Sequence, residues 1–161
     1  MDHEAKKRVL RSVPYGLYAL GVAGGPDGEP MGALVAWLTQ VSFEPPMLAL
    51  AVERRSATLA ALRRAGAFAV TVLPVDARAL ASRLGRSTET TPGKLAGLSH
   101  RPAPASGAPI FDGGTGWLDC RVRGESAAGD HVLVVADVVE AGVQREGETL
   151  TLAGTGWRYA G

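Results

Sequence analysis

The sequence predicts a mainly β protein, an antiparallel barrel with short helices at its periphery. About seven segments have the composition of strands, and most of them follow one another without a helix between them. Parallel sheets need a crossover helix after nearly every strand, so this order favours antiparallel pairing. The 161 residues are one ordinary domain in length and contain no internal repeat and no linker. We therefore expect residues 1–161 to form a single domain.

The first third of the chain predicts one short helix and three strands. A basic helix over residues 4–12 ends before Pro14, and the turn at 24–30 is dense in Gly, Pro and Asp. Two segments around a double proline are apolar on both faces, as strands buried on both sides are. The polar residues Thr39–Ser42 between them are expected to form an elbow. The expected strands span 15–24, 31–42 and 47–53.

The rest of the chain predicts two helices and four more strands. Ser56 is a suitable N-cap for a helix that stops at Gly66, and Asp76 and Gly85 bracket a second one. In the segment 115–125, Trp117, Asp119, Arg121 and Arg123 alternate with Leu118, Cys120 and Val122, which predicts a strand with one solvent-exposed face and Cys120 in the core. The polar stretch 86–93 is expected to be a loop. The remaining strands are expected at 67–73, 131–143 and 148–153.

Charge and cysteine content exclude several classes of function. With 17 Lys and Arg against 16 Asp and Glu, the net charge of +1 is too small to hold a nucleic-acid backbone. The only cysteine, Cys120, permits no intramolecular disulfide, which favours a reducing compartment, and we expect a cytoplasmic protein. No apolar run approaches the length of a membrane span, roughly 18 to 20 residues. The N-terminal residues lack the apolar centre of a secretion signal.

The motifs of several chemistries are also missing. The three histidines, His3, His100 and His131, are far apart in the sequence and Cys120 has no cysteine partner, so no metal site is expected. The sequence contains no GxSxG, P-loop or HExxH motif, and its glycine-rich stretch at 21–28 does not follow the GxGxxG pattern.

Three segments are candidates for a binding site. In "VERRSATLAAL", two arginines follow a strand that ends at Glu53 and precede a helix that starts at Ser56, so N–H groups, a hydroxyl and guanidinium groups can converge on a phosphate-sized anion. The alternative is a capped helix with two solvated arginines. His131 begins a long buried strand, where it either contacts a substrate or has a structural role. The elbow either binds a planar heterocycle beside Trp37 or is a capped turn.

Together these segments resemble the flavin reductase-like family, whose fold is an FMN-binding split barrel. The resemblance runs from Val13 to Gly161. It is carried by "AWLTQVSFEPPMLALAV", "RRSAT", "AFAVTVL", "RLGRST" with "GKLAGL", "AGDHVLVVADVVEAG" and "TGWRY", in this order and spacing. The chain departs from the family pattern at Ala33, Leu34 and Val35, where many relatives place Asn, Thr or Ser, and at Leu95, where an aromatic residue is common.

The resemblance implies a Greek-key split barrel, a homodimer, and a site for FMN or FAD. The implied flavin ring and ribityl contacts lie in the segment from Ala36 to Ser42, and the implied phosphate contacts lie at the start of the helix, at residues 54–58. Gly85 and Arg86 are further implied cofactor contacts, and the nicotinamide contacts lie at Gly129–Asp130–His131 and in the tail. The implied cofactor-binding residues are Ala36, Trp37, Leu38, Thr39, Gln40, Val41, Ser42, Arg54, Arg55, Ser56, Thr58, Gly85 and Arg86. The implied NAD(P)H-binding residues are Gly129, Asp130, His131, Trp157 and Tyr159, and His131 is the implied catalytic residue.

The activity that the resemblance implies is NAD(P)H:flavin oxidoreduction, in which hydride passes from nicotinamide to flavin. The implied recipient of the reduced flavin is a partner such as a flavin-dependent monooxygenase, or another acceptor. Two other hypotheses stay open. One is a non-catalytic flavin-binding or electron-carrier dimer, and the other is a split barrel that holds a different planar ligand, such as haem.

Overall fold

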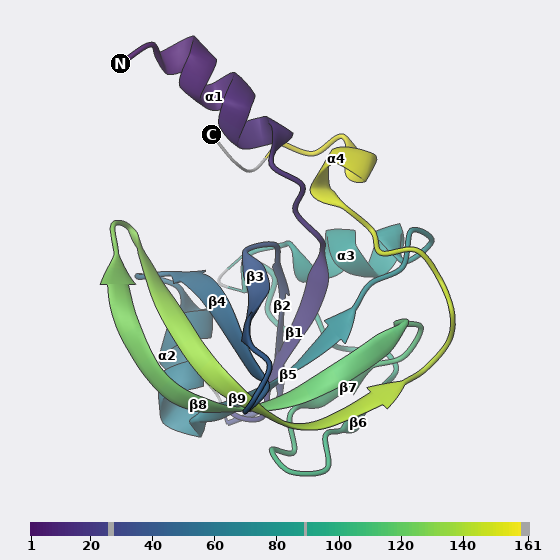
Figure 1. Cartoon of the computed structure of the whole chain (residues 1–161). Coiled ribbons are helices and arrows are strands. Elements are labelled where there is room, and N and C mark those ends of the chain that lie inside the picture. Colours follow the sequence, from purple (N-terminus) through teal and green to yellow (C-terminus); the bar gives the residue numbers. More distant parts are fainter. Residues whose placement is uncertain (26–27, 89, 159–161) are drawn as a thin grey trace.

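A computed structural model describes residues 1–25, 28–88 and 90–158 (Figure 1). Within these ranges the chain is mainly β with short helices, as predicted. Seven strands form one antiparallel sheet in the order β2-β1-β5-β8-β9-β4-β3, and β6 and β7 pair separately. The strands are β1 (Tyr18–Val22), β2 (Met31–Val35), β3 (Leu38–Ser42), β4 (Met47–Glu53), β5 (Ala67–Val72), β6 (His100–Pro102), β7 (Pro109–Phe111), β8 (Gly116–Ala128) and β9 (His131–Val143).

The sheet is strongly curled, because its two edge strands are joined directly. In a flat sheet of this order, the outer strands β2 and β3 would lie roughly 29 Å apart. Only Ala36 and Trp37 separate the two strands in sequence, and the three residue steps from Val35 to Leu38 can span about 11 Å at most. The sheet therefore bends round until its edges approach each other, which makes a barrel. Figure 1 shows β2 and β3 meeting near the centre of the molecule.

The helices lie at the periphery of this barrel. Ser56 caps α2 by accepting a hydrogen bond from the Leu59 N–H at 3.2 Å, and Gly66 ends the helix with a φ of 64°, the left-handed conformation that glycine adopts readily. None of the residues of α1 is buried, and Figure 1 shows this helix projecting from the barrel. The helices are α1 (His3–Ser12), α2 (Ala57–Ala65), α3 (Arg78–Leu84) and α4 (Leu152–Thr155).

The core fills the space between the curled sheet and α2. Its largest cluster joins Phe68 and Leu20 of the sheet to Leu59 and Leu62 of α2. Burying each such side chain contributes roughly 1.5–3 kcal/mol relative to exposure. A second cluster around Leu17, Leu73 and Leu84 packs α3 and the C-terminal segment against the barrel. Both clusters border the cavity described below, so they fix the positions of its walls.

Four details of the predicted elements are wrong. Asp76 does not cap the second predicted helix, because α3 begins at Arg78 with Ala77 in the N-cap position and no side-chain hydrogen bond caps it. Residues 31–42 form two strands that bend at Ala36–Trp37, and Thr39–Ser42 belong to the edge strand β3, so the turn falls at residues 43–46. Residues 148–153 form only isolated bridges at Thr149 and Thr151, because Thr151 instead caps α4. The short strands β6 and β7 were not predicted, because strands of three residues are too short to show a recognisable alternation of apolar and polar residues.

The predicted solvent-exposed face of β8 is wrong at two of its four positions. Asp119 is fully buried and its carboxylate accepts hydrogen bonds from the N–H groups of Ala105 and Ser106, at 2.8 and 3.1 Å. Trp117 is buried beside Arg101, which lies 5.1 Å from its ring centre. The segment around β6 and β7 covers this face, and a bulge between Asp119 and Cys120 breaks the alternation. Cys120 is buried as predicted, and burial raises the pKa of its thiol to about 12.

Candidate functional site

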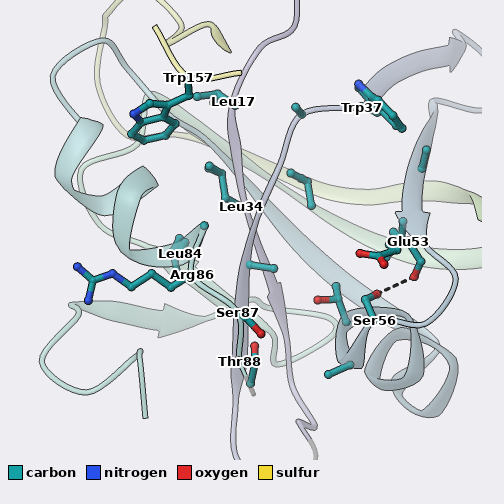
Figure 2. A pocket seen from close by; sticks show the side chains of 18 of the residues that line it. Leu17, Leu34, Trp37, Glu53, Ser56, Leu84, Arg86, Ser87, Thr88 and Trp157 are labelled. Carbon is teal, nitrogen blue, oxygen red and sulfur yellow. Dashed lines mark hydrogen bonds between the residues drawn. The ribbon is translucent and has the colours of Figure 1, made fainter. Parts of the chain in front are cut away.

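A cavity of about 700 Å³ lies where the bend between β2 and β3 faces the end of β4 (Figure 2). The start of α2, the end of α3 with the loop after it, and the C-terminal segment complete its walls. One part of the wall is apolar and comes from Leu17, β2 and the bend after it, β4, the end of α3 and the C-terminal segment. Another part carries hydroxyl and guanidinium groups. The apolar part consists of Leu17, Ala33, Leu34, Val35, Ala36, Trp37, Ala51, Val52, Leu84, Leu152 and Trp157.

The polar end of the cavity combines two segments that are distant in sequence. Ser56 and Thr58 come from the start of α2, and Ser87 and Thr88 from the loop after α3. Figure 2 shows Ser56, Ser87 and Thr88 gathered at this end. The first turn of α2 also presents N–H groups that its own helix leaves unpaired, and a helix N-terminus favours anions. This end therefore has the donors and the field that a phosphate group needs.

Cations outnumber acids around the cavity. Arg55, Arg86, Lys94 and Arg158 line it, and Glu53 is the one carboxylate among its described lining residues. Lys94 is nearly buried, and its Nζ donates hydrogen bonds to the carbonyl oxygens of Leu84 at 3.2 Å and Arg86 at 2.8 Å. Burial lowers the pKa of this ammonium group. Its position ties the loop that carries Ser87 and Thr88 to the end of α3.

Arg83 ties the same loop from the other side. Its guanidinium group donates hydrogen bonds to the carbonyl oxygens of Lys94, at 2.6 Å, and of Ala96. The end of α3 and the segment 94–96 thus hold each other in place. Arg83 of α3 donates to carbonyl oxygens of the segment, and Lys94 of the segment donates to carbonyl oxygens at the end of α3 and just after it. This arrangement also supplies partners for carbonyls at the C-terminal end of α3, where positive charge is favourable.

The turn between β8 and β9 places His131 beside Trp37. Gly129 and Asp130 form a two-residue connection between β8 and β9. Such tight hairpin turns require a positive φ at the first turn residue, and Gly129 supplies it with a φ of 64°. The His131 ring lies 4.6 Å from the Trp37 ring, centre to centre, and its Nδ1 lies 2.7 Å from a carboxylate oxygen of Asp130. The hydrogen bond from His131 lowers the pKa of Asp130, and the charge of the imidazolium adds to this effect.

Arg54 holds this turn against the end of β4. Its backbone N–H donates to the Asp130 carbonyl oxygen at 3.0 Å, and its guanidinium group donates to the Gly129 carbonyl oxygen at 2.6 Å. Glu53 and His131 are directly paired across β4 and β9. The hairpin turn, the end of β4 and the start of α2 are therefore one connected unit at the mouth of the cavity.

Residues 10–160 match the flavin reductase like domain family. The chain belongs to this family. A flavin reductase from Pseudomonas putida is 33% identical over 150 residues, which cover 93% of this chain and 85% of that protein. Another relative, named flavin reductase (NADH), from Kitasatospora aureofaciens, is 29% identical over 91% of this chain and 75% of its own length.

Solved structures of this family have the same fold. The NADH:FAD oxidoreductase from Streptomyces globisporus superposes with a TM-score of 0.83 at 26% identity, covering 95% of this chain and 90% of that one. The same oxidoreductase has also been solved in complex with NAD and FAD fragments, and that structure has a TM-score of 0.84 at 25% identity, over 95% of this chain and 89% of that one. The predictions of the family, of a mainly β fold and of a flavin reductase are confirmed.

The structure gathers about half of the predicted flavin reductase site around one cavity. Leu38 and Thr39–Ser42 lie outside it in β3, and Arg54 binds the hairpin turn. His131 lies next to the cavity through its ring contact with Trp37, and Gly129 and Asp130 form the turn before it; none of the three lines the cavity. Tyr159 is outside the described residues. The predicted residues that line the cavity are Ala36, Trp37, Arg55, Ser56, Thr58, Gly85, Arg86 and Trp157.

Sequence reasoning missed several lining residues of this flavin reductase. Ser87 and Thr88 were assigned to a polar loop and belong to the family mark "RLGRST", but they were not predicted to line the site, although the hydroxyl pair directly after Gly85 and Arg86 resembles the arrangement in "RRSAT". Lys94 belongs to the family mark "GKLAGL" but was given no role in the site, because a single lysine in a loop is normally exposed. Glu53 was seen only as the end of a strand. The β2 residues Ala33–Val35, noted as a departure from the family pattern, line the cavity as an apolar wall.

Among the described helices, none is long and apolar enough to span a membrane. In the same part of the chain, no three side chains of the His, Cys, Asp and Glu types come together as a metal site would require.

Proposed function

We propose that this chain is an NAD(P)H-dependent flavin reductase that transfers hydride from nicotinamide to FMN or FAD in the cavity beside Trp37. The observation that supports this most directly is the composition of the cavity. An apolar wall suited to a planar ring continues into an end with hydroxyls, arginines and a helix N-terminus suited to a phosphate. The ring and phosphate ends of a flavin mononucleotide have the same order.

The proposed contacts follow the geometry of the walls. Ala36, Trp37 and the β2 wall would hold the flavin ring, and Ser56, Thr58 and Arg55 would hold the phosphate with Ser87 and Thr88. The bound flavin supplies the redox chemistry. The protein excludes water from the ring and orients it, because hydride transfer requires the two reacting rings to be stacked at close range.

His131 is the proposed positioning group for the nicotinamide. Its ring is held between Trp37 and Asp130, and the hydrogen bond at Nδ1 leaves Nε2 as the nitrogen that can face a ligand. We assign it the role of a hydrogen-bond partner that orients the nicotinamide or the flavin edge, without a role as an acid.

The same proposal includes a monooxygenase that receives the reduced flavin, a homodimer, and a cytoplasmic location. A flavin-dependent monooxygenase reductase subunit from Mycobacterium tuberculosis is 29% identical over 86% of this chain and 73% of its own length, which supports a monooxygenase as the recipient of reduced flavin. Exposed apolar residues on the barrel, Val41 and Phe43, support the split-barrel homodimer. The cytoplasmic location rests on the single, buried cysteine and stays a prediction.

The test is an absorbance spectrum of the purified protein with added FMN or FAD, followed by NADH and NADPH oxidation assays. A perturbed flavin spectrum together with steady oxidation of NADH or NADPH is the expected result. A protein that perturbs neither flavin spectrum and oxidises neither nucleotide would contradict the proposal. Flavin binding without nucleotide oxidation would instead indicate the non-catalytic carrier.

A further inference from the structure

We propose that Glu53 recognises the hydroxyl groups of the flavin's ribityl chain, and so favours ligands in which a polyol joins the ring to the phosphate. This inference deepens the proposed function and rests on it. It concerns the one acidic side chain in the cation-rich lining of the described cavity.

Glu53 lies between the two ends of the cavity. It is the last residue of β4, and because side chains alternate along a strand, it points away from the core that its neighbour Val52 enters. Figure 2 shows its carboxylate directed into the cavity, from a wall position between Trp37 and Ser56. Trp37 belongs to the proposed ring end and Ser56 to the proposed phosphate end. Glu53 is therefore placed where the middle of a flavin mononucleotide would lie.

The backbone of Glu53 is held from both sides. Its carbonyl oxygen accepts hydrogen bonds from the N–H of Ser56 at 3.1 Å and from the Ser56 hydroxyl at 2.8 Å. On the other side it pairs with His131, and the next residue, Arg54, is bonded to the Asp130 carbonyl oxygen at 3.0 Å. The backbone that carries the carboxylate is therefore fixed beside both proposed contact regions, so only side-chain freedom is lost when the carboxylate binds a ligand.

The chemistry of the carboxylate selects the kind of group it would contact. Within the described residues no hydrogen bond or ion pair engages the Glu53 carboxylate, so its oxygens can accept from a ligand. An ionised carboxylate is an acceptor only and repels a phosphate, so it suits neither the phosphate nor an apolar ring face. Hydroxyl groups are donors, and a polyol offers several in a row. In a flavin mononucleotide, the polyol is the part between ring and phosphate.

The test uses three flavins that differ in this part of the molecule. Riboflavin has the ribityl chain without phosphate, FMN has both, and lumiflavin has neither. Their dissociation constants are measured by fluorescence titration with the unmodified protein, with Glu53→Ala and with Glu53→Gln. Glu146→Ala is the matched control, because Glu146 is an exposed acid that does not line the cavity.

The expected result is selective. Glu53→Ala should weaken riboflavin binding by about 10-fold, the size expected for the loss of a hydrogen bond to a charged group. It should change the affinity for lumiflavin by less than about 2-fold. Glu53→Gln keeps an acceptor and removes the charge, so its loss for riboflavin should be smaller than that of Glu53→Ala. Glu146→Ala should bind all three flavins as the unmodified protein does. Unchanged lumiflavin binding also shows that the variant is folded.

Two results would overturn the inference alone. One is riboflavin binding that is equal in Glu53→Ala and the unmodified protein. The other is an equal loss for riboflavin and lumiflavin, because this would place the effect at the ring. If the unmodified protein binds none of the three flavins, the proposed function fails, and the inference fails with it.

Discussion

The two ends of the cavity are built in different ways. The proposed phosphate end comes from two short segments in which the lining residues lie next to each other in sequence, Arg55–Thr58 and Arg86–Thr88. The proposed ring end depends on Trp37, in the bend between β2 and β3, and on His131 of β9, which meet only through the curl of the sheet. Local sequence can therefore encode an anion site, whereas a ring site of this kind requires the whole fold. The predictions below are ways to separate the two ends.

The largest expected effect concerns the phosphate end. Replacing both Arg55 and Arg86 by Ala should weaken FMN binding by about 10- to 100-fold, because two charge-assisted contacts to phosphate are lost. Riboflavin, which has no phosphate, should change by less than about 2-fold. Fluorescence titration measures both. Arg121→Ala is the control, since Arg121 is exposed and does not line the cavity. Equal losses for the two flavins would contradict a phosphate site here.

The next largest effect concerns the ring end. His131→Ala should slow NADH oxidation by about 10-fold, because a group that orients the reacting rings is removed, and the same orientation sets the rate of hydride transfer. Flavin affinity should stay within about 2-fold, as His131 does not line the cavity. Steady-state kinetics and flavin titration together measure this. An unchanged turnover number would show that His131 has no such role.

Lys94 tests whether the loop at the phosphate end depends on its buried cation. Lys94→Met leaves the Leu84 and Arg86 carbonyl oxygens without this donor, and should lower the free energy of unfolding by about 1–3 kcal/mol. Chemical denaturation measures this change. Lys6→Met, in the exposed helix α1, is the control. Equal stability of the Lys94 variant and the unmodified protein would mean that the loop is held by other contacts.

Arg54 and Arg55 are neighbours that belong to different ends. Arg54→Ala should reduce turnover by a few-fold, by loosening the turn that carries His131, and should affect FMN and riboflavin binding equally little. Arg55→Ala should do the reverse, with weaker FMN binding and unchanged turnover at saturating FMN. The comparison of these two single variants uses the same assays. Identical behaviour would remove the distinction between the two arginines.

The smallest expected effect depends on pH. The pKa of Asp130 in the folded protein lies below its ordinary value of 3.8. The stability that the contact between Asp130 and His131 contributes is therefore present above the pKa that Asp130 has in the unfolded chain. It is lost as the pH falls through the lower pKa that Asp130 has in the folded protein. Thermal unfolding of Asp130→Asn and the unmodified protein should differ slightly above about pH 4 and converge in stronger acid. A difference that grows in acid would contradict the pairing.

Local patterns predicted the parts of this protein that local chemistry determines. Ser56 as an N-cap, Gly66 as a helix stop and Cys120 as a core residue are all confirmed. The mainly β fold and the family are confirmed as well. These features depend on a few neighbouring residues or on the order of the elements along the chain.

The remaining features depend on contacts between distant segments. Asp119 is buried because the loop at 103–108 folds over β8 and supplies two N–H donors, which strand alternation cannot reveal. Thr39–Ser42 were assigned to an elbow because they are polar, but an edge strand exposes its residues without any turn. Lys94 and Glu53 reach the cavity only through the packing of α3 and the end of β4.

The most direct test of the account is a crystal structure of the protein with bound FMN. The account predicts the phosphate between the start of α2 and the loop at Ser87–Thr88, the ring beside Ala36 and Trp37, and the ribityl chain next to Glu53. A phosphate at the Arg158 side of the cavity, or a ring bound on β3 at Thr39–Ser42 outside the cavity, would contradict it.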